Sequence, residues 1–361
     1  MSNENTKKMI SMYREMRPTE MFLSNLFRAP RENYYNSQTI EIDIERSDES
    51  VAIVMTDLAT GYNMFSEDQY TNKEFLAPVL KEASPLNAFD LIKRQSGQNP
   101  FQEPNFVANA MRQTMKKMRK LEDRARRHIE LQASQVLQTG TLSLIDNDGV
   151  VRYALDYKPK STHFPTSGTT WGQTGSDESG DLISLANVIR GDGRMDPTVL
   201  IFGQTAFEVG MGENGNLRGR FETRRLDLGT ISPFRPRAGG GQYRGVMDLG
   251  NYKFDVWTYN GRYDHPQTGA NTQFVDPGKV ICFTPGARLN ATFGSIPRFA
   301  PIDPRVRPFI PARRIRGDRM DLNVNGWISD DGEQLIVGVG TRPLLIPTAI
   351  DTYGCLTTGL S

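Results

Sequence analysis

The most regular feature of the chain is an apolar stripe at helical spacing between Pro104 and Thr139. Within this stretch an apolar side chain recurs at every third or fourth position: Val107, Met111, Met115, Met118, Leu121, Ala125, Ile129, Ala133 and Val136. Such spacing places all of them on one face of an α-helix. Pro104 suits a first helical turn, and Gly140 suits the end of a helix. The pattern predicts one unbroken helix over 104–139, about 50 Å long at ~1.5 Å per residue.

The chain before this helix alternates with a period of two residues. In the segment 39–45, Ile40, Ile42 and Ile44 are separated by acidic side chains, which predicts a strand with one solvated face. A second apolar run covers 51–55, and Phe75 opens a run that returns toward the helix. These runs predict an extended β-hairpin loop over 38–95. Because an isolated hairpin is marginally stable in water, it would need a partner surface.

Helices and strands are mixed in the chain after the helix. Two apolar runs flank Gly149 and predict a tight hairpin over 141–155. The segment 181–190 has helical spacing, and the continuous apolar run 198–202 indicates a buried strand. Further strands are predicted near 252–259 and 280–284, where we expect a pair, and over 320–339 around a turn.

The N-terminal residues 1–37 are predicted to form an arm with one apolar block. Phe22, Leu26 and Phe27 supply its anchors, and Thr19 is a candidate cap for a short helix. An apolar block in a polar arm must pack against something. Its own domain and a neighbouring subunit are both open as the partner surface.

Composition excludes some classes of protein. Hydrophobic residues make up 37% of the chain, which suits a folded core, and no run of about 18 apolar residues occurs that would span a membrane. The N-terminus lacks the apolar stretch of a secretory signal, so we expect folding in a cytoplasm. Lys and Arg number 43 against 42 Asp and Glu. This balance disfavours a dedicated DNA-binding enzyme, which would carry a basic excess.

Candidate catalytic residues are sparse. His128 is predicted on a solvated face of the long helix, while His163 and His265 fall in loops, and none has another ligand at metal-binding spacing. Cys282 and Cys355 have no partner motif and are expected to be free thiols. Glycine-rich stretches lack the context of a phosphate or dinucleotide loop. We therefore expect no catalytic site, no cofactor and no metal site.

Two basic clusters remain to be explained. One lies on the polar side of the long helix, and the other comprises Arg313, Arg314 and Arg316. A nucleic-acid patch is disfavoured, because interleaved aromatic residues and an overall basic excess are missing. A solvated or salt-bridged face is the simplest interpretation. In an assembly, such clusters would instead meet acidic stretches of a neighbour, such as 43–49, and set its register.

The order of elements resembles the lambda-type major capsid protein family of tailed bacteriophages (major capsid protein E), over essentially the whole chain. The resemblance rests on a series of blocks in family order: the Phe22–Phe27 arm, the return strand from Phe75 to Ile92, the long helix ending in Leu137–Leu142, the hairpin ending in Leu155–Tyr157, Trp171, the Asp196–Gly203 strand and the Pro-rich end Arg342–Pro347. No single block is specific; their joint order carries the resemblance.

The resemblance implies the α+β tailed-phage major capsid fold, divided into six regions. These are the N-terminal arm (1–37), the extended loop (38–95), a peripheral subdomain (96–180) with the spine helix 104–139, an axial subdomain (181–300), return strands (301–345) and a C-terminal tail (346–361).

The same resemblance implies a structural protein and no enzyme. Hexamers and pentamers would form an icosahedral head shell around double-stranded DNA, bound without sequence specificity. The shell would assemble in the host cytoplasm and end in the virion. The expected partners are copies of the chain, a separate scaffolding protein, a portal and, as an option, a decoration protein. Expected assembly contacts are Phe22, Leu26, Phe27, Ile40, Ile42, Ile44, Phe75, Arg313, Arg314 and Arg316.

Three other functions are alternatives to this one. A nanocompartment shell protein of the same fold would enclose an enzyme. A hydrolase with an α/β core would need a nucleophile elbow and a positioned histidine, and the sequence offers neither. A tail-tube or portal protein would lack a long helix followed by a mixed subdomain.

Overall fold

The structure, a computed structural model, describes residues 21–30, 34–35, 39–45, 70–87, 106–145, 148–213, 215–221, 240–285, 289–294, 296, 305–306 and 322–360. In 34–35, 39–45, 70–76 and 106–109 it describes the backbone alone. Arg313, Arg314 and Arg316, and the predicted strand 51–55, lie outside the described residues.

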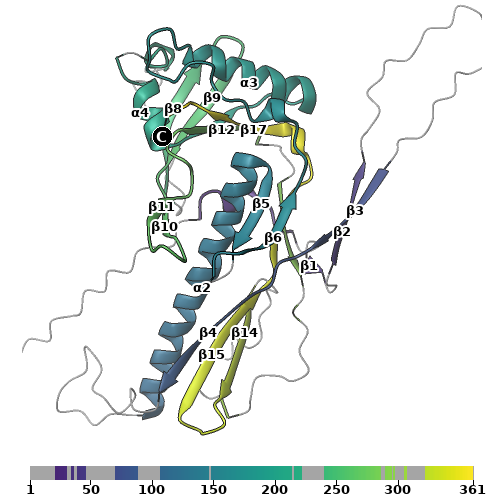
Figure 1. Ribbon diagram of the computed structural model, residues 1–361, viewed down its shortest axis with the longest axis vertical. Coiled ribbons are helices and arrows are strands. Elements are labelled where there is room, and N and C mark those ends of the chain that lie inside the picture. The colour runs from purple at the N-terminus through teal and green to yellow at the C-terminus, as the bar shows by residue number, and fades with distance from the viewer. Residues whose placement is uncertain are drawn as a thin grey trace, which may run out of the picture.

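The predicted spine helix is confirmed as α2, Phe106–Thr139, which runs along the long axis of the molecule (Figure 1). Gly140 ends it with a positive φ of 66°, and its N–H donates to the Val136 carbonyl at 2.9 Å. This left-handed position favours glycine, and an added Cβ would also collide with Pro159. The chain therefore turns sharply into the predicted hairpin, β5 (Thr141–Ile145) and β6 (Val151–Asp156).

A five-stranded sheet forms the upper part of the molecule in Figure 1. Its strand order is β17 (Tyr353–Thr357), β12 (Lys279–Phe283), β7 (Val199–Phe202), β9 (Lys253–Tyr259) and β8 (Gly241–Asp248). The expected pairing of 252–259 with 280–284 is wrong, because β7 lies between β9 and β12. The C-terminal strand β17, expected as part of a tail, pairs antiparallel with β12.

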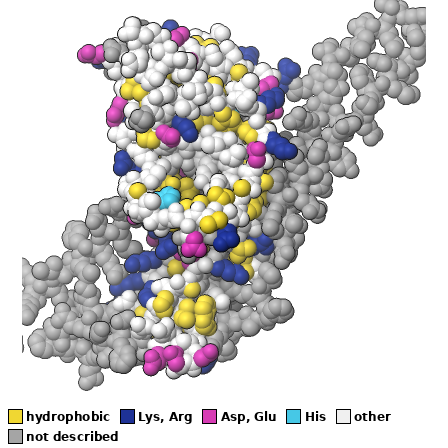
Figure 2. Space-filling model, viewed as in Figure 1, with side chains coloured by type: hydrophobic (Ala, Val, Ile, Leu, Met, Phe, Trp, Pro, Cys, Tyr) yellow, Lys and Arg dark blue, Asp and Glu magenta, His cyan; other side chains and the backbone are white. Residues whose placement is uncertain are grey.

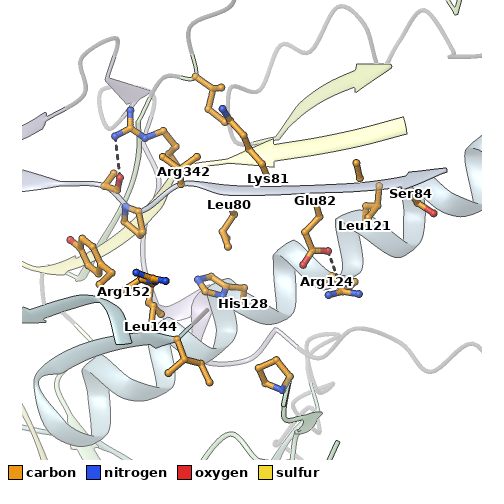
Figure 3. Close-up of a pocket in the computed structure, with 18 of the residues that line it drawn as sticks. Leu80, Lys81, Glu82, Ser84, Leu121, Arg124, His128, Leu144, Arg152 and Arg342 are labelled. Carbon is orange, nitrogen blue, oxygen red and sulfur yellow. Dashed lines mark hydrogen bonds and ion pairs between the residues drawn. The ribbon is translucent and has the colours of Figure 1, made fainter. Parts of the chain in front are cut away.

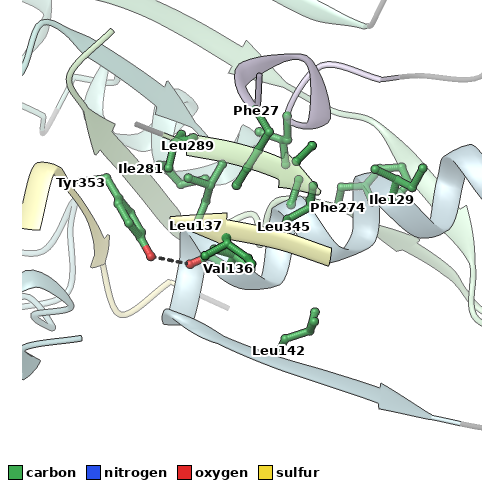
Figure 4. Close-up of a cluster of buried hydrophobic side chains, with 14 of the residues drawn as sticks. Phe27, Ile129, Val136, Leu137, Leu142, Phe274, Ile281, Leu289, Leu345 and Tyr353 are labelled. Carbon is green, nitrogen blue, oxygen red and sulfur yellow. Dashed lines mark hydrogen bonds between the residues drawn. The ribbon is translucent and has the colours of Figure 1, made fainter. Parts of the chain in front are cut away.

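This sheet is buried on both faces, which explains the continuous apolar run of β7. Leu200 and Phe202 belong to a core with α3 (Glu178–Gly193) and α4 (Gln204–Gly210). Ile201 points to the opposite face and joins a second core with the C-terminal part of α2. Strands β13 (Leu289–Gly294) and β16 (Pro343–Pro347) and the arm complete that second core (Figure 4).

The lower part of the molecule is a three-stranded sheet packed along α2 (Figure 1). Its order is β14 (Asn323–Ile328), β15 (Gln334–Thr341) and β4 (Leu80–Asn87). The predicted turn within 320–339 is confirmed between β14 and β15. Strand β4, which the sequence placed in the extended loop, pairs instead with β15 over its whole length.

Two further pairs and the short elements complete the described chain. Strand β2 (Thr39–Glu45) pairs with β3 (Tyr70–Leu76), and this hairpin stands clear of the body on the right of Figure 1. Strand β10 (Arg262–Asp264) pairs with β11 (Asn271–Gln273) beside α2. Strand β1 covers Tyr34–Tyr35. The short 3-10 helices are η1 (Ser24–Leu26), η3 (Ser161–His163), η4 (Arg218–Arg220) and η7 (Ile350–Thr352).

Candidate assembly surfaces

The arm block packs against its own chain. The Phe22 ring lies 5.4 Å from the Trp257 ring and 5.2 Å from the Tyr259 ring, measured between centroids. Leu23 is 0% exposed and Phe27 is 5% exposed, and both belong to the core around the C-terminal part of α2. Of the two partners that the sequence left open, its own domain holds this block.

A buried carboxylate fixes the start of the short helix η1 in the arm. Glu130 of α2 accepts hydrogen bonds from the Leu23 N–H at 2.7 Å and the Ser24 N–H at 2.9 Å. The first N–H groups of a helical turn lack partners within the turn, and the carboxylate supplies them. Burial raises the pKa of Glu130, while these hydrogen bonds lower it, with a net upward shift. This role could not be predicted from local sequence, because Glu130 is one of many charged residues between the apolar positions of the helix.

The arm and the projecting hairpin leave the body at neighbouring points. Tyr35 of β1 pairs with Gly294 of β13 just before the hairpin begins. Ala77, directly after β3, lies next to Gly294, since a Cβ built there would be 3.4 Å from the Ala77 Cβ. The buried Arg342 donates to the Ala77 carbonyl at 3.0 Å. The hairpin β2–β3 is therefore an insertion whose two ends meet at one place on the body.

A groove of about 1170 Å³ lies between β4, α2 and the β5–β6 hairpin (Figure 3). Strand β4 is the edge strand of its sheet, so the groove follows an unpaired strand edge. Apolar side chains of the groove include the 53% exposed Val79 and the 36% exposed Ile145. Its charged lining is mostly basic: Lys81, Glu82, Lys117, Lys120, Arg124, Arg152 and Arg342.

The charged residues of the groove are partly engaged with each other. Arg124 pairs with Glu82 at 2.7 Å across the space between α2 and β4, as Figure 3 shows. Lys117 donates to the carbonyl of Pro85 in β4. Because Glu82 is the one acidic lining residue against six basic ones, the groove keeps a positive charge.

His128 lies at this groove, and its predicted solvated setting is wrong. The ring is half-buried beneath β4 and points toward Leu80 in Figure 3. Its Nε2 atom is 3.1 Å from the Gln132 amide nitrogen. Burial lowers the pKa of His128 to about 4, so the ring is neutral at physiological pH. The error arose because β4 covers this side of α2, which local sequence cannot show.

His163 has a carboxylate partner without the geometry of a catalytic base. The ring is 1% exposed, with Nδ1 2.9 Å from the Tyr353 carbonyl and Nε2 3.0 Å from Asp192 Oδ2. Both ring nitrogens thus face acceptors, so neither is placed to take a proton from a nucleophile. Lys160 also pairs with Asp192 at 2.9 Å. The hydrogen bond from Lys160, then that from His163, lowers the pKa of Asp192.

The other candidate groups also have structural settings. The Nδ1 atom of His265 accepts hydrogen bonds from the backbone of its own turn at Gln267 and Thr268. Cys282 and Cys355 are free and buried, and burial raises the pKa of both thiols. Among the described residues no group of three or more His, Cys, Asp or Glu side chains is arranged to hold a metal ion. Within the same residues, no helix is both long and apolar enough to cross a membrane.

The predicted assembly contacts fall into three groups in the structure. Phe22, Leu26 and Phe27 pack within their own chain. Ile40, Ile42, Ile44 and Phe75 lie on the paired backbones of β2 and β3, where Ile40 and Phe75 are directly opposite. The arginines of 313–316 lie outside the described residues. The groove itself was missed, because its lining comes from several separate segments of the chain between Ala77 and Arg342.

The chain matches the model of a family described as phage major capsid protein E over residues 5–353. This match spans nearly the whole chain. The chain belongs to the phage major capsid protein E family. It is a structural protein of the bacteriophage capsid, as its resemblance to that family implied.

One solved structure supports the fold of this capsid protein, and two others are similar to a lesser degree. A prophage protein of E. coli CFT073 described as a capsid protein superimposes with a TM-score of 0.57 at 17% identity, covering 80% of this chain and 79% of that one. The capsid of Ralstonia phage GP4 gives 0.49 at 9% identity, covering 95% and 85%. An encapsulin complex from Synechococcus elongatus PCC 7942 gives 0.40 at 11% identity, covering 90% and 84%. No curated protein sequence matches the chain.

Proposed function

We propose that this capsid protein assembles into hexamers and pentamers that close into an icosahedral head shell around double-stranded DNA. The observation that carries the proposal is the projecting hairpin β2–β3. In the described part of the chain, its strands pair only with each other. A lone two-stranded hairpin is marginally stable in water. A second copy of the chain supplies the surface that the hairpin needs.

The groove beside β4 suits such a hairpin from a neighbouring copy. The sequence of β2, Thr39–Glu45, alternates Ile with Glu or Asp, and the groove combines exposed aliphatic side chains with six basic residues. Apolar burial would supply affinity, and opposite charges would fix the register of the strand. Ile40, Ile42, Ile44 and Phe75 are the proposed hairpin contacts. The arginines Arg313, Arg314 and Arg316 are a second proposed contact with a neighbour.

The wider setting follows from a shell of this kind. Repetition of one weak interface over a closed symmetric shell makes the assembly collectively stable. Assembly takes place in the host cytoplasm with a separate scaffolding protein and a portal, and a decoration protein is a further candidate partner. The protein has no enzymatic activity in this proposal. The setting of His163, with both nitrogens facing acceptors, supports that part.

Removal of the hairpin tests the proposal. The variant replaces residues 39–76 by a short Gly–Ser linker, because Tyr35 and Ala77 both lie beside Gly294. Strand β4 stays in place with β15, so the body should keep its fold. Sedimentation and negative-stain microscopy should show folded monomers or small oligomers where the full chain forms shells. Closed shells from the deletion variant would refute a role for the hairpin in assembly.

A charge exchange tests the proposed seat of the hairpin. Glu41→Lys with Asp43→Lys in the hairpin should block assembly, as should Lys120→Glu with Arg152→Glu in the groove. The four substitutions together should restore shells, because the opposite charges then face each other again. Failure of the combined variant to assemble, while it remains folded, would place the hairpin elsewhere. Nucleic acid or a host enzyme inside purified shells would separate a virus head from a nanocompartment.

A further inference from the structure

Four exposed arginines line α2 on the side away from the sheet: Arg112, Arg119, Arg126 and Arg127. We name these four residues the arginine face. Arg112, Arg119 and Arg126 follow one another at intervals of seven residues, which is close to two helical turns. They therefore form a nearly straight row with about 10 Å between successive Cα atoms. Figure 2 shows Lys and Arg side chains gathered over this lower part of α2.

The charge of the arginine face is little compensated within the described part of the chain. No acidic side chain there forms an ion pair with any of the four arginines. Arg126 contacts the Met21 sulfur at 3.9 Å, and Arg127 donates to the Asp123 carbonyl within its own helix. Two acidic residues lie between the two ends of the face: Asp123 is half-buried, and Glu122 is buried at 6% exposed. By contrast, Arg124 on the groove side of α2 has its carboxylate partner in Glu82.

The arginine face concentrates positive charge on a chain that is nearly neutral as a whole. The protein carries only one net positive charge, so the positive field of the arginine face is local. Like charges held along one rigid helix repel each other, and a bound polyanion relieves that repulsion. Each arginine can also donate two hydrogen bonds to one phosphate group.

The sequence alone favoured a solvated or salt-bridged face here, but the described residues give these four arginines no acidic partner. We propose that the arginine face binds the phosphate backbone of double-stranded DNA without reading its sequence. This inference rests on the proposed function, since it assigns the contact between the shell and its genome to one surface. The face extends over about 22 Å of a straight helix. A duplex presents one phosphate every ~3.4 Å along each strand. Over the same length each strand therefore presents about six phosphates, enough for each of the four arginines to meet one.

Two other partners fit this surface less well. Single-stranded nucleic acid is held largely by bases stacked on aromatic side chains, and no aromatic residue occurs between 106 and 139 beyond Phe106. A protein partner would use buried apolar or aromatic anchors at the centre of its interface. The centre of the arginine face is occupied by Lys116 and Asp123 instead.

The test measures binding of unassembled full-length protein to a fluorescent duplex of mixed sequence, about one to two helical turns long, by anisotropy between 50 and 200 mM salt. The logarithm of affinity falls with the logarithm of salt by about 0.9 per phosphate contact. The variant Arg119→Gln with Arg126→Gln should lower this slope by about 2. Near 0.1 M salt, its affinity should fall by roughly 60-fold.

Two further variants keep the test specific. Asp123→Asn removes the acid from the centre of the face and should strengthen binding, which general misfolding would not do. Arg218→Gln with Arg220→Gln removes two exposed arginines from η4, away from α2, and should leave affinity within about twofold. Gln is used because it keeps a long polar side chain and good helix propensity.

Several outcomes would overturn the inference. Equal losses from the α2 and η4 pairs would show that binding follows net charge alone. Absence of duplex binding by the unaltered protein would also refute the inference. Competition by a poly-glutamate peptide as effective as competition by unlabelled duplex of equal charge would assign the face to an acidic protein. Microscopy of the same variants distinguishes failure of this inference from failure of the proposed function. Shells should still form when DNA binding is lost.

Discussion

The two halves of α2 share one helix but have different surroundings. In the C-terminal half, Ala133, Val136 and Leu137 are 0% exposed in a core that joins the arm, the five-stranded sheet and strands β13 and β16. In the N-terminal half, Met118 is 1% exposed, and among the described residues its cluster holds only Val306, Val324, Val337 and partly buried neighbours. The groove and the arginine face both lie along the first two thirds of the helix, between Arg112 and His128.

The difference shows how one helix can both stabilise the body of the protein and present a surface to other molecules. The buried half ties together segments from the arm to the C-terminal strand, so it fixes the body. The other half is covered on one side by a three-stranded sheet whose edge strand is unpaired. Its remaining surface is charged and open to a neighbour or to a polyanion. Substitutions that probe each half should therefore differ in kind as well as in size.

Truncation of the large core should have the largest effect. Leu137→Ala leaves a cavity in that core, and we expect a loss of about 2–5 kcal/mol in the free energy of unfolding. Met118→Ala, in the small cluster, should cost less because fewer segments surround it and they can relax. Urea unfolding of both variants measures the difference. A larger loss for Met118→Ala would contradict the contrast between the two halves.

Removal of the Glu130 carboxylate should release the arm. Glu130→Ala leaves the N–H groups of Leu23 and Ser24 buried without an acceptor, and we expect a cost of about 1–3 kcal/mol. Hydrogen exchange should accelerate at these two amides more than in β7. Glu130→Gln keeps one acceptor oxygen and serves as the control with an intermediate effect. Unchanged exchange at both amides would exclude this carboxylate as the fixing point.

The burial of His128 should make stability depend on pH in a defined window. Its pKa is lowered from 6.5 to about 4, so the unfolded chain binds the proton more tightly. The stability that this group contributes is complete above pH 6.5 and is lost as pH falls through 4. The change is on the order of 2 kcal/mol, allowing for the partial exposure of the ring.

The comparison of two histidine variants isolates this effect. His128→Gln should flatten the melting temperature between pH 6.5 and 4, whereas His265→Gln, in a surface turn, should leave the profile as it is. Identical profiles for the unaltered protein and His128→Gln would mean that the ring is solvated after all.

The ion pair across the groove should contribute least. Both side chains of Arg124 and Glu82 are well exposed, at 63% and 37%, so we expect a coupling of about 0.2–1 kcal/mol. A double-mutant cycle with Arg124→Gln and Glu82→Gln measures it. A coupling well above that range would mean that the groove is drier than its exposure indicates.

Local sequence patterns predicted the helices and strands of this protein better than the way these elements pair and pack. The stripe of α2 and the turn at Gly149 depend on residues close in sequence, and both were correct. Strand β4 was assigned to the hairpin because it follows β3 directly, yet it pairs with β15 about 250 residues later. The same limit applies to the groove, and to Glu130, whose partners Leu23 and Ser24 lie more than 100 residues earlier. The resemblance to capsid proteins succeeded because it used the order of elements and not their pairing.

Electron cryomicroscopy of the full chain, expressed alone and with a candidate scaffolding protein, tests the central claim most directly. The account predicts closed shells, or rings of five and six copies, in at least one of the two preparations. Averaged particles should show density from one copy along the β4 edge of the next. Dispersed, folded monomers in both preparations would contradict a shell-forming role for this chain.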